Sequence, residues 1–469
     1  MKHVILGAGP AGVIAAETIR KHAPNDTITI VGDEPEAPYS RMAIPYLLIG
    51  NIQEPGTHLR HTADHFARHR IEVLRGLRAE SVNTQAQTVK LSDGRVLPYD
   101  KLLVATGSRP ASPPIPGINS PGVHSCWTLA DARAIMALAK PGAKVVQMGA
   151  GFIGCIIMEA LAMRGVKLSV VEMGDRMVPR MMGPTAGGMI KDWCERKGVK
   201  VYTGARVDSI SSAAGAATSS AGAAPAASAQ PGILGKIAAI LGFGAPTPAP
   251  APVAAPAISD GPALTVRLSS GQTLEADLVI SATGVKPNVG FLQGSGVAIQ
   301  AGIVTDARMA TNVPNVYAAG DCAEAWDQPS GTHVVSAIQP NAADEARIAA
   351  LNMVGQAAAL QRVPQINVLD TLGLISSSFG QWQGVPGGEQ VELTDRAADR
   401  HLSLQFSGDR LVGCNSIGWT DHVGVMRGLV EGDVSLGEWK QTLLKDPTKL
   451  MEAYLARAQG ASSPALVKS

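Results

Sequence analysis

Two short glycine-rich stretches are the residues of this chain best suited to bind a phosphate group. Each carries three glycines at the spacing GxGxxG, namely Gly7, Gly9 and Gly12 in the first and Gly149, Gly151 and Gly154 in the second. Glycine permits the tight turn and lets the backbone approach a pyrophosphate, whose charge then lies at a helix N-terminus. A lone GxGxxG is weak evidence, so the flanking elements must decide.

An acidic residue follows each glycine turn at the end of the next expected strand. Asp33 and Glu34 follow the first turn, and Glu172 follows the second. Such an acid accepts hydrogen bonds from the adenosine ribose of a dinucleotide. Glu172 would repel a 2′-phosphate, which favours NAD over NADP, whereas the nearby Arg176 weakens that preference. The sequence therefore predicts two dinucleotide sites.

Both turns stand in the setting that phosphate binding requires. Strands are expected at 3–6 and from residue 27, with a helix at about 11–22 between them. The same order recurs in AKVVQM, a helix at 155–164 and KLSVVE. Two such units predict an α/β fold with two Rossmann-like dinucleotide-binding domains. The segment after about residue 366 mixes strands with a closing helix, which predicts a third, α+β domain.

Composition excludes several classes of function. The chain has 469 residues, too many for one compact core, and a formal net charge of +1, which gives no case for binding nucleic acid. Its five cysteines are far apart in sequence, so neither a redox dithiol nor a cysteine metal site is expected. We expect no metal, although His61, His65 and His69 have a spacing that could chelate one. The absence of a signal peptide and of an apolar run of membrane-spanning length predicts a cytoplasmic protein.

Further motifs identify a family resemblance that covers nearly the whole chain. VGDEPEAPYSR, YDKLLVATGSRP, TNVPNVYAAGDCAE and IQPNAADEARIAALNMVG follow one another in the order found in the pyridine nucleotide-disulfide oxidoreductase superfamily. The chain resembles the branch of NADH:rubredoxin reductases, ferredoxin reductases and the flavin domain of nitrite reductase. The resemblance implies FAD and NAD as cofactors. It also implies an FAD-binding domain at 1–116 and 284–360, an NAD-binding domain at 117–283 and a C-terminal interface domain at 361–469.

The resemblance also assigns cofactor-binding roles residue by residue. The expected FAD-binding residues are Gly7, Gly9, Pro10, Ala11, Gly12, Asp33, Glu34, Arg41, Ala105, Thr106, Gly107, Arg109, Gly320, Asp321, Gln339 and Pro340. The expected residues of the NAD side are Gly149, Gly151, Phe152, Ile153, Gly154, Glu172 and Gly284. Asp321 is expected at the ribityl chain, and the helix starting near Gln339 is expected to point its N-terminus at the flavin pyrimidine.

The stretch PYSRMAIPYLLI lacks the reactive groups that relatives carry there. The lysine of the ferredoxin reductases aligns with Tyr46 and its glutamate partner with Ile156, and Met42 lies where other branches place a cysteine. Neither Met42 nor its neighbour Ala43, the other candidate for that position, can act as a nucleophile. We expect Tyr46, Ile156 and Met42 to form an apolar wall beside the flavin, since hydride transfer to a flavin requires orientation more than an acid or base.

These observations predict an enzyme that passes electrons from NADH through FAD to a rubredoxin-like or ferredoxin-like protein, without a redox-active cysteine. The alternatives are an NADH oxidase or quinone reductase and the flavin subunit of a larger complex. Residues 212–257 are rich in Ala, Pro, Ser and Gly and interrupt a hairpin pattern, so we expect an extended insertion. Within it, the apolar helical spacing in 231–244 could bind a partner or a membrane surface. A homodimer is also possible.

Overall fold

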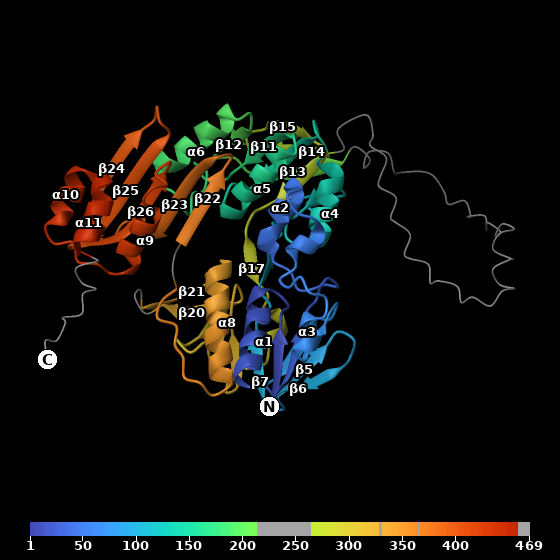
Figure 1. The fold of residues 1–469 in the computed structure, drawn as a ribbon. Helices are drawn as coiled ribbons and strands as arrows, with labels where there is room; N and C mark the ends of the chain where they lie inside the picture. Colours follow the sequence, from blue (N-terminus) through green and yellow to red (C-terminus); the bar gives the residue numbers. More distant parts are fainter. Residues whose placement is uncertain (213–263, 328–330, 364–365, 458–469) are drawn as a thin grey trace, which may run out of the picture.

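The computed structural model describes residues 1–212, 264–327, 331–363 and 366–457 (Figure 1). The insertion expected at 212–257, with its segment 231–244, lies outside the described residues apart from Ser212. The strands on either side of it, β13 (Val207–Ser212) and β14 (Leu264–Leu268), pair antiparallel with Ser212 opposite Leu264. The insertion therefore connects two adjacent strands of one sheet.

The first glycine turn belongs to a five-stranded sheet in which every adjacent pair of strands is parallel. In spatial order its strands are β19 (Val316–Ala318), β7 (Lys101–Val104), β1 (Lys2–Leu6), β2 (Thr27–Val31) and β3 (Ile71–Leu74). Four consecutive residues of β1 are buried, as in a parallel sheet covered on both faces. Helices α1 (Pro10–His22) and α8 (Gln339–Met353) pack side by side along it (Figure 1). Because β19 and α8 come late in the chain, this domain is split, as the sequence predicts.

The second glycine turn belongs to another five-stranded parallel sheet. Its strands are β12 (Lys200–Tyr202), β11 (Lys167–Val171), β10 (Lys144–Met148), β16 (Leu278–Ser281) and β9 (Val123–His124). Its helices are α4 (Leu129–Leu138), α5 (Phe152–Met163) and α6 (Pro184–Arg196). Helix α5 begins directly after Gly151, three residues before the expected start, so that its first turn faces the site described below. Two Rossmann-like units are thus confirmed.

Small sheets complete the two units and connect them. Three-stranded sheets are formed by β4 (Ala79–Asn83), β5 (Thr88–Leu91) and β6 (Val96–Pro98), by β13, β14 and β15 (Thr273–Ala276), and by β18 (Ile303–Thr305), β20 (Ala323–Asp327) and β21 (Thr332–Val334). The chain passes between the units twice, in β8 (Ser108–Pro110) and β17 (Val285–Pro287), and these two strands pair antiparallel. The exact domain limits stay a prediction.

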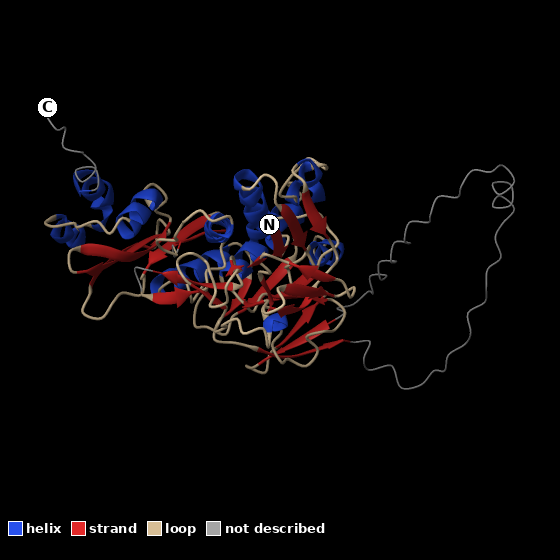
Figure 2. Ribbon diagram, turned by 90° about the horizontal axis from the view of Figure 1, so that it is seen from below, coloured by secondary structure: helices blue, strands red, loops and turns tan. Residues whose placement is uncertain are grey.

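The C-terminal part is an antiparallel sheet with helices on one side, which confirms the α+β expectation. Its strands, in spatial order, are β22 (Ile366–Thr371), β23 (Leu374–Gly380), β26 (Arg410–Ile417), β25 (Arg400–Ser407) and β24 (Glu389–Asp395). Up to residue 457, where the described part of the chain ends, three helices rather than one follow the strands: α9 (Val423–Glu431), α10 (Trp439–Lys445) and α11 (Leu450–Arg457). Figure 2 shows them together on one side of the sheet, where they share an apolar core with Leu402, Leu404 and Phe406 of β25.

The stretch PYSRMAIPYLLI bridges the two Rossmann-like units. It forms the short helices η1 (Arg41–Ala43) and α2 (Ile44–Ile49). Ile44, Leu47 and Leu48 are buried, and they join the apolar core of the second unit rather than that of the first. Their spacing of three and four residues puts them on one face of α2, so Tyr46 lies on the opposite face with 56% of its surface exposed.

Candidate active site

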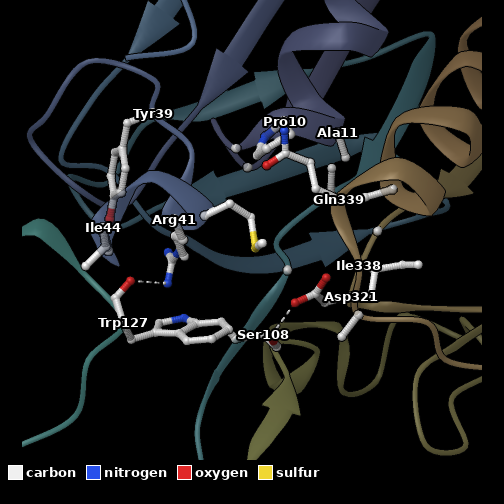
Figure 3. A pocket seen from close by; sticks show the side chains of 18 of the residues that line it. Pro10, Ala11, Tyr39, Arg41, Ile44, Ser108, Trp127, Asp321, Ile338 and Gln339 are labelled. Carbon is white, nitrogen blue, oxygen red and sulfur yellow. Dashed lines mark hydrogen bonds between the residues drawn. The ribbon is translucent and has the colours of Figure 1, made fainter. Parts of the chain in front are cut away.

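A cavity of about 490 Å³ opens between the two Rossmann-like units and the C-terminal domain (Figure 3). Its lining comes from the first glycine turn, residues 32–45, the segment after β7, Trp127, the start of α5, the turn after β19, the start of α8, and Ile366, Val368 and Arg427. The predicted residues that it brings together are Gly7, Gly9, Pro10, Ala11, Asp33, Glu34, Arg41, Met42, Ala105, Thr106, Gly107, Phe152, Ile153, Ile156, Gly320, Asp321, Gln339 and Pro340.

Other predicted residues lie outside this lining, for distinct reasons. They are Gly12, Tyr46, Arg109, Gly149, Gly151, Gly154, Glu172 and Gly284. A Cβ on Gly12 would lie 1.9 Å from the Gly7 carbonyl oxygen, so Gly12 serves close packing within the turn. Arg109 is exposed and donates to Asn288 at 3.4 Å. Ile44 and Pro45 line the cavity where the sequence led us to expect Tyr46, because α2 buries its apolar face in the second core.

The first glycine turn is shaped to hold a pyrophosphate. Gly7 has φ +118°, and a Cβ there would lie 1.9 Å from the Ala105 carbonyl oxygen, so only glycine fits. Gly9 precedes α1 with an ordinary φ of −79°, and nothing lies within 4 Å of where its Cβ would be. No side chain caps this end of α1. The free amides and the open space at Gly9 form a cradle for phosphate oxygens.

Glu34 is the centre of a polar cluster at one end of the cavity. Its carboxylate accepts from the Tyr39 hydroxyl at 2.6 Å and from the Arg41 guanidinium at 2.7 Å. Burial raises the pKa of Glu34, while the hydrogen bond from Tyr39 and the charge of Arg41 act in the opposite direction. Burial also raises the pKa of Tyr39. The cluster fixes Glu34 at the end of β2, where an adenosine ribose would lie.

Asp321 marks the other end of the cavity. Its carboxyl accepts from the hydroxyl of Ser108, the first residue of β8, at 2.6 Å (Figure 3). The N-terminus of α8 lies beside it, with Gln339 and Pro340 in the lining and no side-chain cap. Ser40 donates to the Gln339 side chain at 2.6 Å and so joins this end to the Arg41 segment. The arrangement suits a hydroxylated chain followed by a ring that gains electron density.

Trp127 and Cys126 line the cavity although the sequence did not indicate them. The Trp127 indole donates to the Ser108 carbonyl at 2.9 Å, and the Arg41 guanidinium lies 5.1 Å from its ring centre. A capping box between Thr128 and Asp131 fixes this segment. That box is visible in the sequence, but it indicates only a helix start. Burial, with a smaller contribution from Asp131, raises the pKa of Cys126 to about 12, so this residue is a thiol and not a nucleophilic thiolate.

The second glycine turn repeats the geometry of the first. Gly149 has φ +96°, and its Cβ would lie 2.3 Å from the Ala282 carbonyl oxygen. Gly151 precedes α5 with φ −74° and with nothing within 4 Å of its Cβ position. Gly154 packs against the Gly149 carbonyl. This turn, between β10 and α5, is therefore a second phosphate cradle.

Glu172 and Arg176 differ in what their side chains contact. Glu172 accepts from the backbone amides of Ala150 at 2.7 Å and Gly174 at 2.8 Å, so it is held against the glycine turn. Arg176 donates to the Met182 carbonyl at 2.9 Å and to Asp175 at 2.7 Å, with a side chain only 19% exposed. The acid is thus held at the glycine turn, while the guanidinium is engaged within its own loop.

Helix α5 connects the two cradles. Gly151 lies in the second cradle, whereas Phe152, Ile153 and Ile156 of the same helix line the first cavity. A dinucleotide on the second cradle would therefore extend along α5 toward the cavity. Within the described residues, no group of three His, Cys, Asp or Glu side chains is placed to hold a metal ion, and His65 instead contacts Glu17 at 2.8 Å. No helix of the described residues is long and apolar enough to cross a membrane.

The molecule thus has two phosphate cradles, each with an acid after the following strand, and helix α5 runs from the second cradle to the cavity of the first. This arrangement is typical of enzymes that transfer electrons between a nicotinamide and a flavin. The similarity of this chain to known proteins agrees with this class. Residues 1–226 and 253–345 match the family described as pyridine nucleotide-disulphide oxidoreductase. The chain belongs to this family and is an oxidoreductase that uses FAD and NAD(H).

Individual relatives cover nearly the whole chain. The NADH-dependent phenylglyoxylate dehydrogenase subunit epsilon of Aromatoleum evansii is 31% identical over 450 residues, which are 95% of each chain. Rhodocoxin reductase of Rhodococcus erythropolis is 30% identical over 89% of this chain and 86% of its own. The structure of a covalent putidaredoxin reductase–putidaredoxin complex superposes with a TM-score of 0.80 over 97% of this chain and 99% of that one, and at 23% identity it shows the fold alone.

Proposed function

We propose that this protein oxidises NADH and passes the electrons through FAD to a small redox protein, without a protein nucleophile. The observation that carries the proposal is the wall of the cavity at α5 and η1. Phe152, Ile156 and Met42 form it, and Cys126, which lines the same cavity, is held protonated by burial. Such a wall can orient a ring and exclude water, but it cannot form a covalent intermediate.

Each part of the site has a definite task in this proposal. FAD, when bound, supplies the electron chemistry and can release electrons singly or in pairs. Gly9 and the amides of α1 hold its pyrophosphate, Glu34 its ribose and Asp321 its ribityl hydroxyls. Gly151 and Glu172 hold NADH in the same way. Val368 and Met42 are 46% and 52% exposed, which leaves the apolar rim open to an acceptor.

The proposal is tested by comparing electron acceptors with purified holoprotein. NADH oxidation is measured with a rubredoxin, a [2Fe–2S] ferredoxin, molecular oxygen and a quinone. Turnover with one redox protein should exceed turnover with oxygen and quinone at least about tenfold. Equal or faster turnover with oxygen or quinone would instead establish the NADH oxidase or quinone reductase alternative.

A second proposal is that the protein is the flavin subunit of a larger oxidoreductase complex. It is favoured by the likeness to the epsilon subunit of phenylglyoxylate dehydrogenase, which extends over 95% of both chains. A tagged chain expressed in its native host should then co-purify with further redox subunits in fixed ratio. Isolation as a monomer or homodimer by light scattering would contradict this second proposal. We propose the cytoplasm as the compartment of the protein.

The insertion is a candidate for the contact with such a partner. We expect replacement of residues 212–257 by a short turn to leave FAD content and NADH-to-dye activity unchanged, because β13 and β14 already pair as neighbours. The amount of partner protein recovered in a pull-down assay should fall. A Gly/Ser segment of equal length is the matched control, and loss of FAD in both variants would assign the insertion a structural task.

A further inference from the structure

Glu345 is a buried acid behind the FAD site to which no motif assigned a task. It lies on α8 with only 1% of its surface exposed. It also lines a second, smaller cavity of about 160 Å³, which borders the FAD cavity. Asn341 and Asp344 contribute to the lining of both cavities. Glu345 therefore lies one layer behind the cofactor site, in contact with a space that can hold water.

The contact of Glu345 with the site runs through one backbone amide. The Gly320 amide donates to the Glu345 carboxyl at 2.7 Å. Gly320 has φ +77° and immediately precedes Asp321, the residue that accepts from Ser108 in the FAD cavity. Glu345 thus fixes the peptide that places Asp321, and any change in its charge acts directly behind the cofactor.

Among the residues that the structure describes, the surroundings of Glu345 provide little to stabilise a negative charge. Its pKa is raised to about 8, mainly by burial. The hydrogen bond from the Gly320 amide acts in the opposite direction, and the nearby acids Asp321 and Asp344 add to the increase. Arg362 lines the same small cavity, but its guanidinium donates to the Glu431 carbonyl. Arg347 of the same helix pairs with Asp344. From α1, the methyl group of Ala11 faces Gly320, so this helix adds no charge at the contact.

We propose that Glu345 is a positioning residue that couples the redox potential of bound FAD to pH: it is neutral in the working enzyme and, on losing its proton, makes reduction of the cofactor less favourable. The O–H bond of the carboxyl breaks, the proton passes to water in the small cavity, and a carboxylate remains against the Gly320 amide. Negative charge that develops at the N-terminus of α8 is then opposed by a second charge on the same helix. This inference rests on FAD binding, and not on the identity of the acceptor.

The sign follows from the two forms of Glu345. Below about pH 8 the carboxyl is neutral, so Glu345→Gln should change the midpoint potential of bound FAD little. Above about pH 8 Glu345 of the wild type becomes charged, and the midpoint potential of the FAD bound to it falls. The glutamine of the variant stays neutral and can still accept a hydrogen bond from the Gly320 amide. The potential of the variant minus that of the wild type should therefore grow more positive with pH, and proton exchange of the flavin itself cancels in this difference.

The experiment is an anaerobic titration of the holoprotein with a reference dye from about pH 6 to pH 10, which requires neither NADH nor an acceptor. We compare the equilibrium constant for FAD reduction in the variant with that in the wild type. The ratio of the two constants should rise about tenfold across this pH range, which is the effect of one carboxylate charge roughly 10 Å from the flavin at an effective dielectric constant near 20. Glu80→Gln is the matched control, since it makes the same substitution at an exposed carboxylate on β4, outside both cavities, and should leave the dependence on pH as in wild type.

A ratio that stays constant across the titrated pH range would overturn the proposal. If the variant loses FAD, infrared spectroscopy of the wild-type holoprotein still decides. A protonated carboxyl band should persist at neutral pH and disappear as the pH rises through about 8, and its absence at neutral pH would overturn the proposal as well. Failure of the acceptor assay would leave these readouts unaffected.

Discussion

The two glycine turns share one sequence pattern and one backbone geometry, yet the chain surrounds them differently. The first turn opens into a cavity of about 490 Å³ with a lining from three parts of the molecule. None of the glycines of the second turn lines that cavity, although Phe152, Ile153 and Ile156 of the following helix α5 do. An enclosed site suits a cofactor that stays bound, and an open cradle suits a nucleotide that must enter and leave.

The acids that follow the two turns show the same contrast. Glu34 is held by Tyr39 and Arg41, which come from the next segment of the chain. Glu172 is held by the amides of Ala150 and Gly174, and so by its own turn. The first acid is therefore tied to a segment that lines the cavity, whereas the second is tied to its own turn. One motif thus serves two tasks, and the neighbours of the motif decide which.

Gly9→Ala should give the largest effect. The backbone accepts alanine at φ −79°, and its methyl group would meet no protein atom within 4 Å, so folding should be preserved while phosphate oxygens are displaced. We expect a folded protein purified without yellow colour, with FAD affinity reduced at least about 100-fold. Absorbance and circular dichroism measure the two properties, and full FAD content would contradict the assignment of the first cradle.

Gly151→Ala is the matched variant in the second cradle, and it should separate the two sites. Its φ of −74° and open Cβ position are nearly those of Gly9. FAD content should remain full, while the KM for NADH rises at least about tenfold and reduction by dithionite is unchanged. Stopped-flow reduction measures this separation. Loss of FAD together with NADH binding would show that the two cradles are not independent.

Glu172→Gln tests the choice of nicotinamide. The amide oxygen can replace only one of two carboxylate oxygens that accept from Ala150 and Gly174, and the charge that repels a 2′-phosphate is lost. The ratio of kcat/KM for NADH to that for NADPH should fall about tenfold. Glu195→Gln, on the exposed surface of the same domain, is the control. An unchanged ratio would remove Glu172 from the ribose site.

Cys126→Ser should give the smallest effect, although this residue lines the FAD cavity. Its pKa of about 12, raised by burial, keeps it a thiol at neutral and mildly alkaline pH, so it supplies neither a nucleophile nor a pH dependence there. The rate of flavin reduction should change less than about twofold. All five cysteines are buried and free, and alkylation of the native protein should leave two electrons per FAD. Uptake of four electrons would reveal a second redox group.

The sequence alone determined the features that depend on local order. Six glycines at fixed spacing, the acids after each second strand and the apolar strands between them predict two βαβ units. Four of these glycines, Gly7, Gly12, Gly149 and Gly154, permit the turn and the close approach of helix and strand. Eighteen of the site residues predicted from these motifs and from the family resemblance line one cavity. The buried, separated cysteines also follow from composition and spacing.

Only the tertiary structure decided how distant segments meet. The sequence led us to expect Tyr46 beside the flavin, but Ile44, Leu47 and Leu48 bury the other face of α2 in the second core, so Tyr46 faces solvent. Trp127 is held at the cavity because its indole donates to Ser108, and Glu345 on α8 reaches the Gly320 amide after β19. Spacing along the chain cannot predict such contacts, because they depend on how the apolar cores of the two Rossmann-like units and of the C-terminal domain pack against one another. The side chains that these cores bury decide which of their neighbours face the cavity.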